Sequence, residues 1–419
     1  MAVYKTIQNV SNRAEQTIIL DIDGVLVPDG MNTISSDVFT YITQLKQSHT
    51  VCICSNGEKE RTWLIAQKLG VSVLDVHKPW GTLQPHSDFK CITDAVIVGD
   101  KYITDGLFAK RFNIPFVKVD HLRSVTDSLY TQIIYMFDDI AWFFVCMFKI
   151  MRPFQWIKNI LIFAPLFFAG GLLYAHSARV FLAVGIFSLS ASFVYVINDY
   201  FDYDQDRQHP RKKNRPFASG DLSCMQMYLI LGFIFVCITL LLFFIPVLVL
   251  PVVLYIGMNI LYSLWIKHNA VIDVVVVSSF YIIRIIVGGL SGQVPLSPWI
   301  LLCVFFGALF IVFGKRRAEY GREIRREVLN EYSEGALDYM FIISSGLAIM
   351  TYGIYTVIGH TSHYLVYSTV FIVIALFRVL NRIYTHPEQA ESPEVLVFTD
   401  PVVLGSFVGW VLYVFWIFY

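Results

Sequence analysis

Two acidic segments of the sequence have residue types and spacings suited to phosphate chemistry. In the first, Asp21 and Asp23 follow directly on the apolar run TIIL. A carboxylate at the end of a strand can attack phosphorus, and a second one can protonate the leaving oxygen. A Mg²⁺ ion would relieve the repulsion between the attacking carboxylate and a phosphate. This segment therefore indicates metal-assisted phosphoryl transfer.

Three later segments carry side chains suited to the same reaction. Ser55 and Asn56, after the run TVCIC, can bind phosphate oxygens, and Lys78 can supply positive charge. Asp100 and Asp105, at and after the end of the run AVIVG, add two carboxylates. Ligands of open α/β sheets bind beyond the carboxyl ends of the strands, so we expect these segments to converge. The alternative for any single segment is ordinary turn chemistry, because Asp, Asn, Ser and Gly favour strand-to-helix loops.

The second acidic segment is NDYFDYDQD, residues 198–206. On a continuous helix, at about 100° per residue, Asn198, Asp199, Asp202 and Asp206 fall within about a 100° arc. Mg²⁺ prefers such oxygen ligands, and a metal held there could bind a diphosphate. The polar loop that follows, HPRKKNRPFASG, supplies cations for the same ligand. A solvated acidic helix end is the alternative interpretation.

The N-terminal part of the chain has the pattern of an α/β domain. Residues 16 to about 122 alternate short β-branched runs with polar or amphipathic stretches, which predicts a parallel sheet wrapped by helices. About 34 residues separate Asp21 from Ser55, and about 22 separate Asn56 from Lys78, so neither gap can hold a sizeable cap domain. We therefore expect a capless, Rossmann-like α/β domain at residues 1–124.

The rest of the chain has the composition of a membrane protein. Hydrophobic residues make up 56% of the sequence and charged residues 15%. Residues 125–151 predict an amphipathic linker helix in the membrane interface, because they mix a broad apolar face with a few charges. Residues 152–419 predict an all-α polytopic domain of about nine transmembrane helices. The expected spans are 157–174, 178–198, 224–243, 245–265, 271–290, 297–315, 338–359, 363–382 and 401–418.

Charged residues indicate how the spans are oriented. The loops at 207–215 and 315–326 and the end of the span closing at Arg382 are rich in Lys and Arg, whereas the opposite loops carry almost none. By the positive-inside rule, the N-terminal domain and both acidic segments face the cytosol, and the C-terminus lies outside. We therefore expect an integral protein of a bacterial inner (plasma) membrane. The formal net charge of zero gives no indication of a nucleic-acid partner.

The order of the N-terminal motifs resembles that of the haloacid dehalogenase (HAD) superfamily, with signatures DxD, S/T-N, Lys and GDxxxTD. The stretches SNGEKER, HKP and GDKYITD are most similar to a small HAD group that includes phosphatidylglycerophosphate phosphatases. The resemblance implies a phosphoric monoester hydrolase with Asp21 as nucleophile and Asp23 as general acid/base. The implied Mg²⁺ ligands are Asp21, Asp23, Asp100 and Asp105. The implied phosphate-binding residues are Ser55, Asn56 and Lys78. A degenerate domain with a regulatory role is the alternative.

The membrane part resembles the UbiA prenyltransferase superfamily. The matching segments are RPFQWIKN at 152–159, the acidic segment with its basic loop, YS at 262–263 and GKRRAE at 314–319. Together they are most similar to the decaprenyl-phosphate phosphoribosyltransferases. The chain departs from the wider superfamily at a second aspartate pair, DxxxD, because Asp273 is followed four residues later by Val277.

This resemblance implies phosphoribosyl pyrophosphate (PRPP) as donor and a polyprenyl (decaprenyl) phosphate as acceptor, with Mg²⁺ binding the departing diphosphate. The implied catalytic residues are Asp202 and Asp206. The implied metal ligands are Asn198, Asp199, Asp202 and Asp206. The implied substrate-binding residues are Gln155, Lys158, Asn198, Lys212, Arg215, Tyr262, Lys267, Asp273, Arg284, Lys315 and Arg316. An arginine inside a span is costly, so Arg284 could instead pair with a neighbouring helix, and Lys315 and Arg316 could simply fix topology.

The sequence as a whole predicts a bifunctional, Mg²⁺-dependent membrane enzyme. Its transferase would make polyprenyl-phosphoryl-5-phosphoribose, and its phosphatase would remove the 5-phosphate to give polyprenyl-phosphoryl-ribose for cell-envelope biosynthesis. Fusion would raise the effective concentration of the first product near the second site. Association into a homo-oligomer is compatible with this interpretation. The alternative is a UbiA prenyltransferase that moves an isoprenoid from its diphosphate to an aromatic or polar acceptor, with a HAD domain of separate or regulatory role. A transporter or scaffold is a third, non-enzymatic reading.

Overall fold

A computed structural model describes residues 16–81, 94–124, 127–171, 177–209, 212–320, 327–359, 362–386 and 393–419. The chain divides into two units, Met1–Phe148 and Lys149–Tyr419. Arg211, Arg322, Arg325 and Arg326, which contribute to the expected orientation of the spans, lie outside the described residues.

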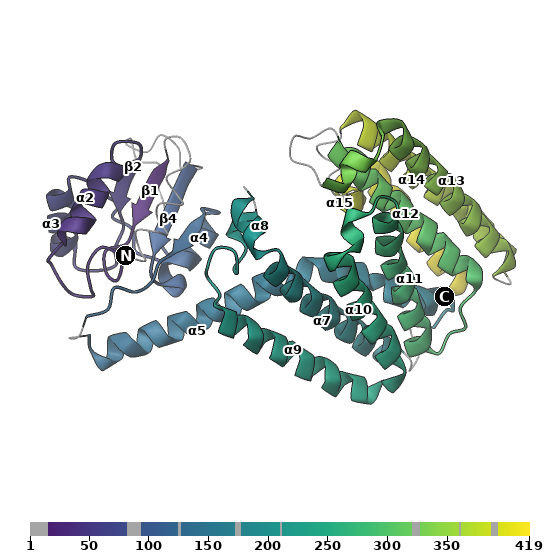
Figure 1. Cartoon of the computed structure of the whole chain (residues 1–419), viewed down its shortest axis with the longest axis horizontal. Helices are drawn as coiled ribbons and strands as arrows, with labels where there is room; N and C mark the ends of the chain where they lie inside the picture. Colours follow the sequence, from purple (N-terminus) through teal and green to yellow (C-terminus); the bar gives the residue numbers. More distant parts are fainter. Residues whose placement is uncertain are drawn as a thin grey trace. The chain divides into compact units, whose positions relative to one another are not determined.

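The β-branched runs near the N-terminus form one five-stranded sheet in the order β3-β2-β1-β4-β5, and every pairing is parallel (Figure 1). This confirms the prediction of a parallel α/β sheet. Because the strands are parallel, the residues that follow β1, β2 and β4 all lie at one edge of the sheet. The strands are β1 (Thr17–Leu20), β2 (Thr50–Ile53), β3 (Ser72–Val73), β4 (Ala95–Gly99) and β5 (Phe116–Lys118).

Both faces of this sheet are buried. Along β1, Ile18 and Leu20 belong to one apolar cluster, whereas Ile19 between them belongs to another. This alternation follows from the two-residue period of a strand, and cover on both faces is usual for parallel sheets. The helical segments of the unit are α2 (Ser36–Leu45), α3 (Lys59–Leu69), the π-helical turn η2 (Tyr102–Gly106), α4 (Leu107–Arg111) and α5 (Leu129–Met151), which continues into the second unit.

The second unit is helical. Among its described residues, eight helices are long and apolar enough to cross a membrane: Ser177–Phe201 (α7), Cys224–Phe244 (α9), Pro246–Leu264 (η5 and α10), Ile272–Gly292 (α11), Pro298–Tyr320 (α12), Glu334–Ile358 (α13), His363–Thr385 (η8 and α14) and Pro401–Phe418 (α16). Each overlaps one of the expected spans, so the prediction of an integral membrane domain is confirmed.

The expected first span, residues 157–174, does not form one α-helix. The chain instead runs as a 3₁₀-helix, η3 (Pro153–Phe163), and then as the short helix α6 (Ala164–Phe168). Pro165 lacks the N–H that an α-helix would use at this position. Among the described residues, eight of the nine expected spans are therefore helices long and apolar enough to cross a membrane, and the first expected span differs because its backbone is interrupted.

Short helical segments complete the second unit, and two helix starts follow rules visible in the sequence. Ser223 and Gln226 form a reciprocal capping box at the start of α9. The Asp400 side chain accepts from the backbone N–H groups of Val402 and Val403 and so caps the start of α16, which has Pro401 in its first turn. The short segments are α8 (Tyr203–Gln208), η4 (Lys212–Asn214), η6 (Ile266–His268), η7 (Glu327–Glu331) and α15 (Pro393–Thr399).

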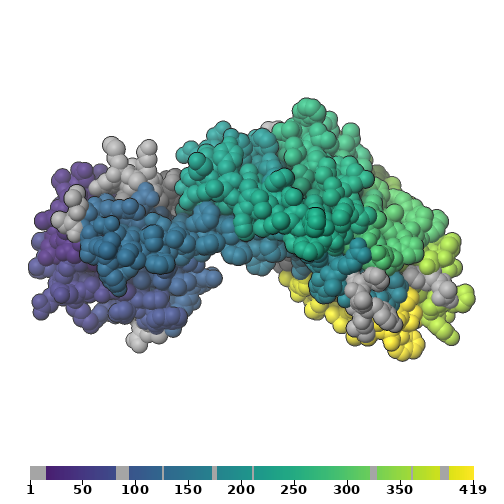
Figure 2. Space-filling model, turned by 90° about the horizontal axis from the view of Figure 1, so that it is seen from below, coloured from purple at the N-terminus to yellow at the C-terminus, as the bar shows by residue number. Residues whose placement is uncertain are grey.

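The end of the chain packs against the segment that opens the membrane unit. The rings of Phe168 and Phe418 lie 6.3 Å apart, and the Tyr419 hydroxyl donates to the Phe167 carbonyl at 3.3 Å. In the space-filling view of Figure 2, the yellow C-terminal residues accordingly lie beside the blue residues of this segment. The irregular η3–α6 segment is therefore held by packing from the far end of the sequence.

We predict that Gly288→Ala destabilises the membrane unit. A Cβ at Gly288 would lie 2.1 Å from the carbonyl oxygen of Ile162, so α11 and η3 would have to move apart. Overpacking of this kind costs about 1–3 kcal/mol, which should appear as a lower thermal unfolding temperature in detergent. Gly307→Ala in α12 is the matched control, because its Cβ would meet no atom within 4 Å. Equal unfolding temperatures for the two variants would contradict this close approach.

Candidate active sites

The N-terminal site assembles at the carboxyl ends of the strands. Asp21 follows β1, Asp100 follows β4, and Asp105 lies in the turn η2. Carboxylate oxygens from these three buried residues lie within 4.8 Å of one another. Lys78, which is also buried, forms an ion pair with Asp105, and its Nζ lies 3.0 Å from Asp21 Oδ1. Of the residues on the segments expected to converge, Asp21, Lys78, Asp100 and Asp105 therefore lie together.

Charge and burial shift the protonation of this group. Burial and, to a lesser degree, the neighbouring carboxylate of Asp105 raise the pKa of Asp21 to about 7, against the lowering effect of Lys78. Burial opposes the charge on Lys78, but Asp105 and Asp21 outweigh that effect and raise its pKa. Asp21 and Asp105 thus share one buried ammonium group, whereas Asp100 has the imidazole of His121 2.9 Å from its Oδ2.

The donor set fits a divalent cation. Asp100 Oδ1 is buried and has no hydrogen-bond partner in the described part of the chain, so it is available as a ligand. Gly24 makes the position of Asp100 possible. Its φ is +79°, and a Cβ on it would lie 1.9 Å from Asp100 Oδ2. Only glycine combines that backbone angle with so close an approach. Oxygen ligands of this kind are those that Mg²⁺ takes.

Other residues expected at this site form hydrogen bonds or ion pairs with neighbouring protein groups. Asp23 forms a two-pronged ion pair with Arg61, at 2.7 and 2.9 Å. The Asn56 amide donates to the Lys78 carbonyl and accepts from the Lys78 N–H, both at 2.7 Å. Asn56 therefore holds the loop that carries Lys78. Ser55 Oγ accepts from the N–H of Gly57 at 3.2 Å. Arg61 was not identified from the sequence, although it lies within the quoted stretch SNGEKER.

A cavity of about 310 Å³ opens next to these residues. It has a mixed surface, with one exposed indole ring, an imidazole, hydroxyl groups and charged groups at its rim. The lining residues are Ser55, Asn56, Gly57, Lys59, Thr62, Trp63, Val73, Leu74, Asp75, Val76 and His77.

In the membrane unit, the acidic segment does not form one continuous helix. Helix α7 ends at Phe201, and Asp202 has φ −89° and ψ 6° before the short helix α8. The carboxylates consequently divide into two groups. Arg152 forms an ion pair with the buried Asp199, and Arg215 Nη1 lies 3.2 Å from the same carboxylate. Arg215 Nη1 also donates to Asp206 at 2.5 Å.

Asn198 and Asp202 face a different element. Ser263 Oγ, at the end of α10, donates to Asn198 Oδ1 at 2.8 Å, and Lys267 Nζ lies 3.3 Å from Asp202. Asp206 Oδ1 is buried without a hydrogen-bond partner among the described residues, and Lys212 Nζ lies 3.7 Å from it. This oxygen, which accepts no hydrogen bond from the described residues, fits oxygen ligation of a divalent cation together with Asp202 and Asn198 on neighbouring turns.

Asp273 and Arg316 form a buried pair. Arg316 donates to Asp273 Oδ2 at 2.7 and 3.1 Å, and the Tyr332 hydroxyl donates to Asp273 Oδ1 at 3.2 Å. Both charged side chains are therefore satisfied by the protein. Tyr332 had no signal in the sequence, because it lies 59 residues from Asp273.

Arg284 bridges helices. Its Nε donates to Asn159 Oδ1 at 2.9 Å and its Nη1 to the Phe280 carbonyl at 2.8 Å. Aromatic rings lie around its guanidinium group, with Tyr255 and Tyr281 at 5.5 Å. This is the helix-pairing arrangement that the sequence left open for an arginine inside a span.

The remaining expected residues are placed as follows. Gln155 and Lys158 are half-buried on η3, and Tyr262 on α10 has its ring 6.5 Å from that of Phe280. Lys315 is half-buried on α12, next to Arg316. Arg152 has φ +51° where α5 meets η3, and this left-handed conformation before Pro153 turns the chain.

Comparisons with known proteins concern mainly the membrane unit. Residues 142–399 match the UbiA prenyltransferase family. A decaprenyl-phosphate phosphoribosyltransferase of Mycobacterium tuberculosis is 34% identical over 279 residues, which are 63% of this chain and 91% of that protein. The enzyme of the same name from Mycolicibacterium smegmatis is 36% identical over 219 residues, 49% of this chain and 69% of that protein.

A solved structure is similar in fold. A UbiA homolog from Archaeoglobus fulgidus, determined with bound GPP and Mg²⁺, superposes with a TM-score of 0.50 at 15% identity. The superposition covers 65% of this chain and 99% of that chain. At this identity the likeness concerns the fold of the helical unit alone.

We predict that Lys78→Met destabilises the N-terminal unit by about 3–5 kcal/mol, because it leaves Asp21 and Asp105 buried without their cation. Thermal unfolding in detergent with a chelator would measure the loss. Lys59→Met is the matched control, since Lys59 pairs with Asp75 at the surface, where both side chains are more than half exposed. If both variants unfold at the wild-type temperature, the buried charge balance described above is wrong.

Proposed function

Because the chain belongs to the UbiA prenyltransferase family, we propose that its membrane unit transfers the 5-phosphoribosyl group of PRPP to a polyprenyl phosphate, decaprenyl phosphate being the acceptor implied by its relatives. The observation that carries this proposal is the similarity to decaprenyl-phosphate phosphoribosyltransferases, which extends over 91% of the length of one of them. An isoprenoid transferase is less well supported. Asp273 lies where a second aspartate cluster would be expected, but its two carboxylate oxygens accept hydrogen bonds from Arg316 and Tyr332.

Cationic side chains around the acidic segment suit a diphosphate. Arg215, Lys212 and Lys267 each lie within 4 Å of a carboxylate oxygen of this segment. When a diphosphate enters, its oxygens can take the place of those carboxylates as partners of the same cations. A magnesium ion bound by Asn198, Asp202 and Asp206 would add positive charge to the departing diphosphate.

The proposed transfer is a substitution at C1 of the ribose. The bond from C1 to the diphosphate oxygen breaks, and its electron pair leaves with the diphosphate. An oxygen of the polyprenyl phosphate forms the new bond to C1. Arg215, Lys212 and Lys267 stabilise the negative charge that develops on the leaving group, and the protein contributes mainly by positioning.

We propose that the N-terminal unit is a HAD-type, capless phosphatase acting on the product of this transfer. Its support is the parallel sheet with Asp21, Lys78, Asp100 and Asp105 gathered at one edge. Asp21 would attack phosphorus while Lys78 balances the charge of the phosphoryl group. The ribose oxygen leaves with a proton from Asp23, and water then releases inorganic phosphate from Asp21. A magnesium ion on Asp21 and Asp100, with Asp105 and Asp23 in support, would reduce the repulsion between nucleophile and phosphate.

Two structural features bear on that second step. Arg61 occupies both oxygens of Asp23, so Asp23 reaches a leaving oxygen only after Arg61 moves. The cavity of about 310 Å³ beside Ser55 and Gly57 would receive the ribosyl part of the ester. The product of both steps is polyprenyl-phosphoryl-ribose, a lipid-linked sugar suited to envelope biosynthesis.

We further propose that both sites face the cytosol of a bacterial plasma membrane, with the C-terminus outside, on the basis of the Lys- and Arg-rich loops. PRPP does not cross membranes. Sealed inside-out vesicles should therefore use added PRPP, whereas right-side-out vesicles should use it only after permeabilisation. The opposite pattern would reverse the orientation.

We predict different defects for two asparagine variants when purified protein receives PRPP labelled in the ribose together with decaprenyl phosphate. Asp202→Asn should lower lipid labelling at least about 100-fold, because it weakens the diphosphate site. Asp21→Asn should leave lipid labelling intact and block release of the 5-phosphate. Asp204→Asn is the matched control, since Asp204 is exposed. If Asp21→Asn releases phosphate as the wild type does, the coupled scheme is wrong.

A further inference from the structure

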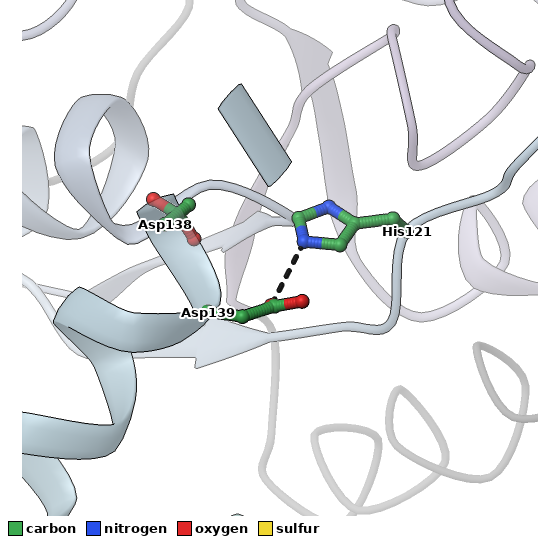
Figure 3. Close-up of side chains that lie close together, drawn as sticks. All are labelled: His121, Asp138 and Asp139. Atoms are coloured by element: carbon green, nitrogen blue, oxygen red, sulfur yellow. Dashed lines mark hydrogen bonds and ion pairs between the residues drawn. The ribbon is translucent and has the colours of Figure 1, made fainter. Parts of the chain in front are cut away.

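His121 connects the N-terminal site to helix α5. Its Nδ1 lies 2.9 Å from Asp100 Oδ2, and its Nε2 lies 3.0 Å from Asp139 Oδ1. Figure 3 shows the imidazole facing Asp139, with Asp138 one residue earlier on the same helix. The Leu122 N–H donates to the Gly24 carbonyl at 2.8 Å, which ties the segment that carries His121 to the loop after β1. His121 therefore joins a residue of α5 to a carboxylate of the site.

Aromatic packing fixes the plane of this imidazole. The ring of Tyr135, also on α5, stacks on it with centroids 4.1 Å apart and an angle of 21°. Lys101, the residue after Asp100, places its Nζ 5.2 Å from the centroid of the Tyr135 ring. About two turns further along α5, Trp142 packs on Tyr102 and Phe116. The first half of α5 is thus packed onto the sheet.

Asp138 holds the turn that carries the other carboxylate. It accepts from the backbone N–H groups of Tyr102 at 2.9 Å and Ile103 at 2.8 Å, at the start of η2. It also pairs with Lys118 at 2.7 Å. His121, Asp138 and Asp139 lie close enough to suggest a second metal site, but both nitrogens of His121 and both oxygens of Asp138 already have partners. The cluster positions neighbouring groups instead.

We propose that α5 is a positioning element of the N-terminal site: Asp139 and Tyr135 orient His121, and His121 holds Asp100 by Oδ2 so that Oδ1 stays available to a divalent cation. The buried, unpartnered Asp100 Oδ1 is the atom on which the proposal depends. The proposal rests on the phosphatase function proposed for the same site. In this proposal, residues 127–148 support the metal-binding carboxylate of the N-terminal site. The sequence alone instead predicts that the N-terminal domain ends at residue 124 and that this segment belongs to a linker helix.

The test is Mg²⁺ binding by full-length protein in detergent, measured by isothermal titration calorimetry. The part of the Mg²⁺-binding heat that disappears in Asp100→Asn is assigned to the N-terminal site. In His121→Gln that component should weaken about 10- to 100-fold, as is usual when a partner of a metal ligand is lost. Asp139→Ala should weaken it in the same direction and should fold normally, because Asp139 is exposed on a helix.

Arg123→Ala is the matched control. Arg123 approaches Asp139 at 3.6 Å from solvent and is 66% exposed, so its loss should leave Mg²⁺ affinity unchanged. Wild-type affinity in Asp139→Ala, or an equal loss in Arg123→Ala, would overturn the proposal. Hydrolysis of a small phosphate monoester separates the two claims. If the wild type binds Mg²⁺ at this site but hydrolyses no monoester, the proposed phosphatase function is wrong. The Mg²⁺ affinities of the His121 and Asp139 variants then still test the role of α5.

Discussion

A carboxylate removed from water has to be balanced by positive charge, and both candidate sites are organised by that requirement. In the N-terminal unit, Asp21 and Asp105 are buried around the ammonium group of Lys78, and Asp100 is buried beside the imidazole of His121. In the membrane unit, Asp199 and Asp206 are buried around Arg215. In both places one carboxylate oxygen, of Asp100 or of Asp206, lacks a hydrogen-bond partner among the described residues. Fixed cations thus balance part of the buried negative charge, and at each site one carboxylate oxygen is left without a hydrogen bond from the described residues.

The same charge balance explains how these sites would treat phosphates. A cation that neutralises a buried carboxylate in the absence of substrate is already placed to bind a phosphate oxygen when substrate enters. Little reorganisation is then needed as negative charge develops on a leaving group. The two units would therefore rely on one principle for two different reactions, substitution at C1 of a sugar and attack on phosphorus.

Local patterns were enough to predict much of the fold. The β-branched runs predicted the parallel sheet, and the parallel pairing of its strands brought the segments that carry Asp21, Lys78, Asp100 and Asp105 together. Long apolar runs likewise predicted the eight described helices that are long and apolar enough to cross a membrane, although they also predicted a ninth span where the backbone is interrupted at η3 and α6. The period of a strand and the length of an apolar run depend only on neighbouring residues, so they can be read from a local pattern. The common edge at which parallel strands end follows from the topology that the alternating pattern predicts.

Contacts between distant residues were not predictable in the same way. Arg152 reaches Asp199 across 47 residues, and Arg284 reaches Asn159 across 125. The single helical face expected for residues 198–206 assumed an unbroken helix, whereas the backbone at Asp202 divides the acidic residues between two sets of partners. Asn56 was expected to bind phosphate, but its amide holds the Lys78 loop, a pairing that no sequence spacing could reveal.

The most direct test of the account follows both halves of one substrate molecule. Purified wild-type protein, Mg²⁺ and decaprenyl phosphate would receive PRPP that carries one radioactive label in the ribose ring and another in the 5-phosphate. The account predicts that the ribose label enters the lipid fraction and that the 5-phosphate label then appears as inorganic phosphate. A lipid fraction free of the ribose label would contradict it.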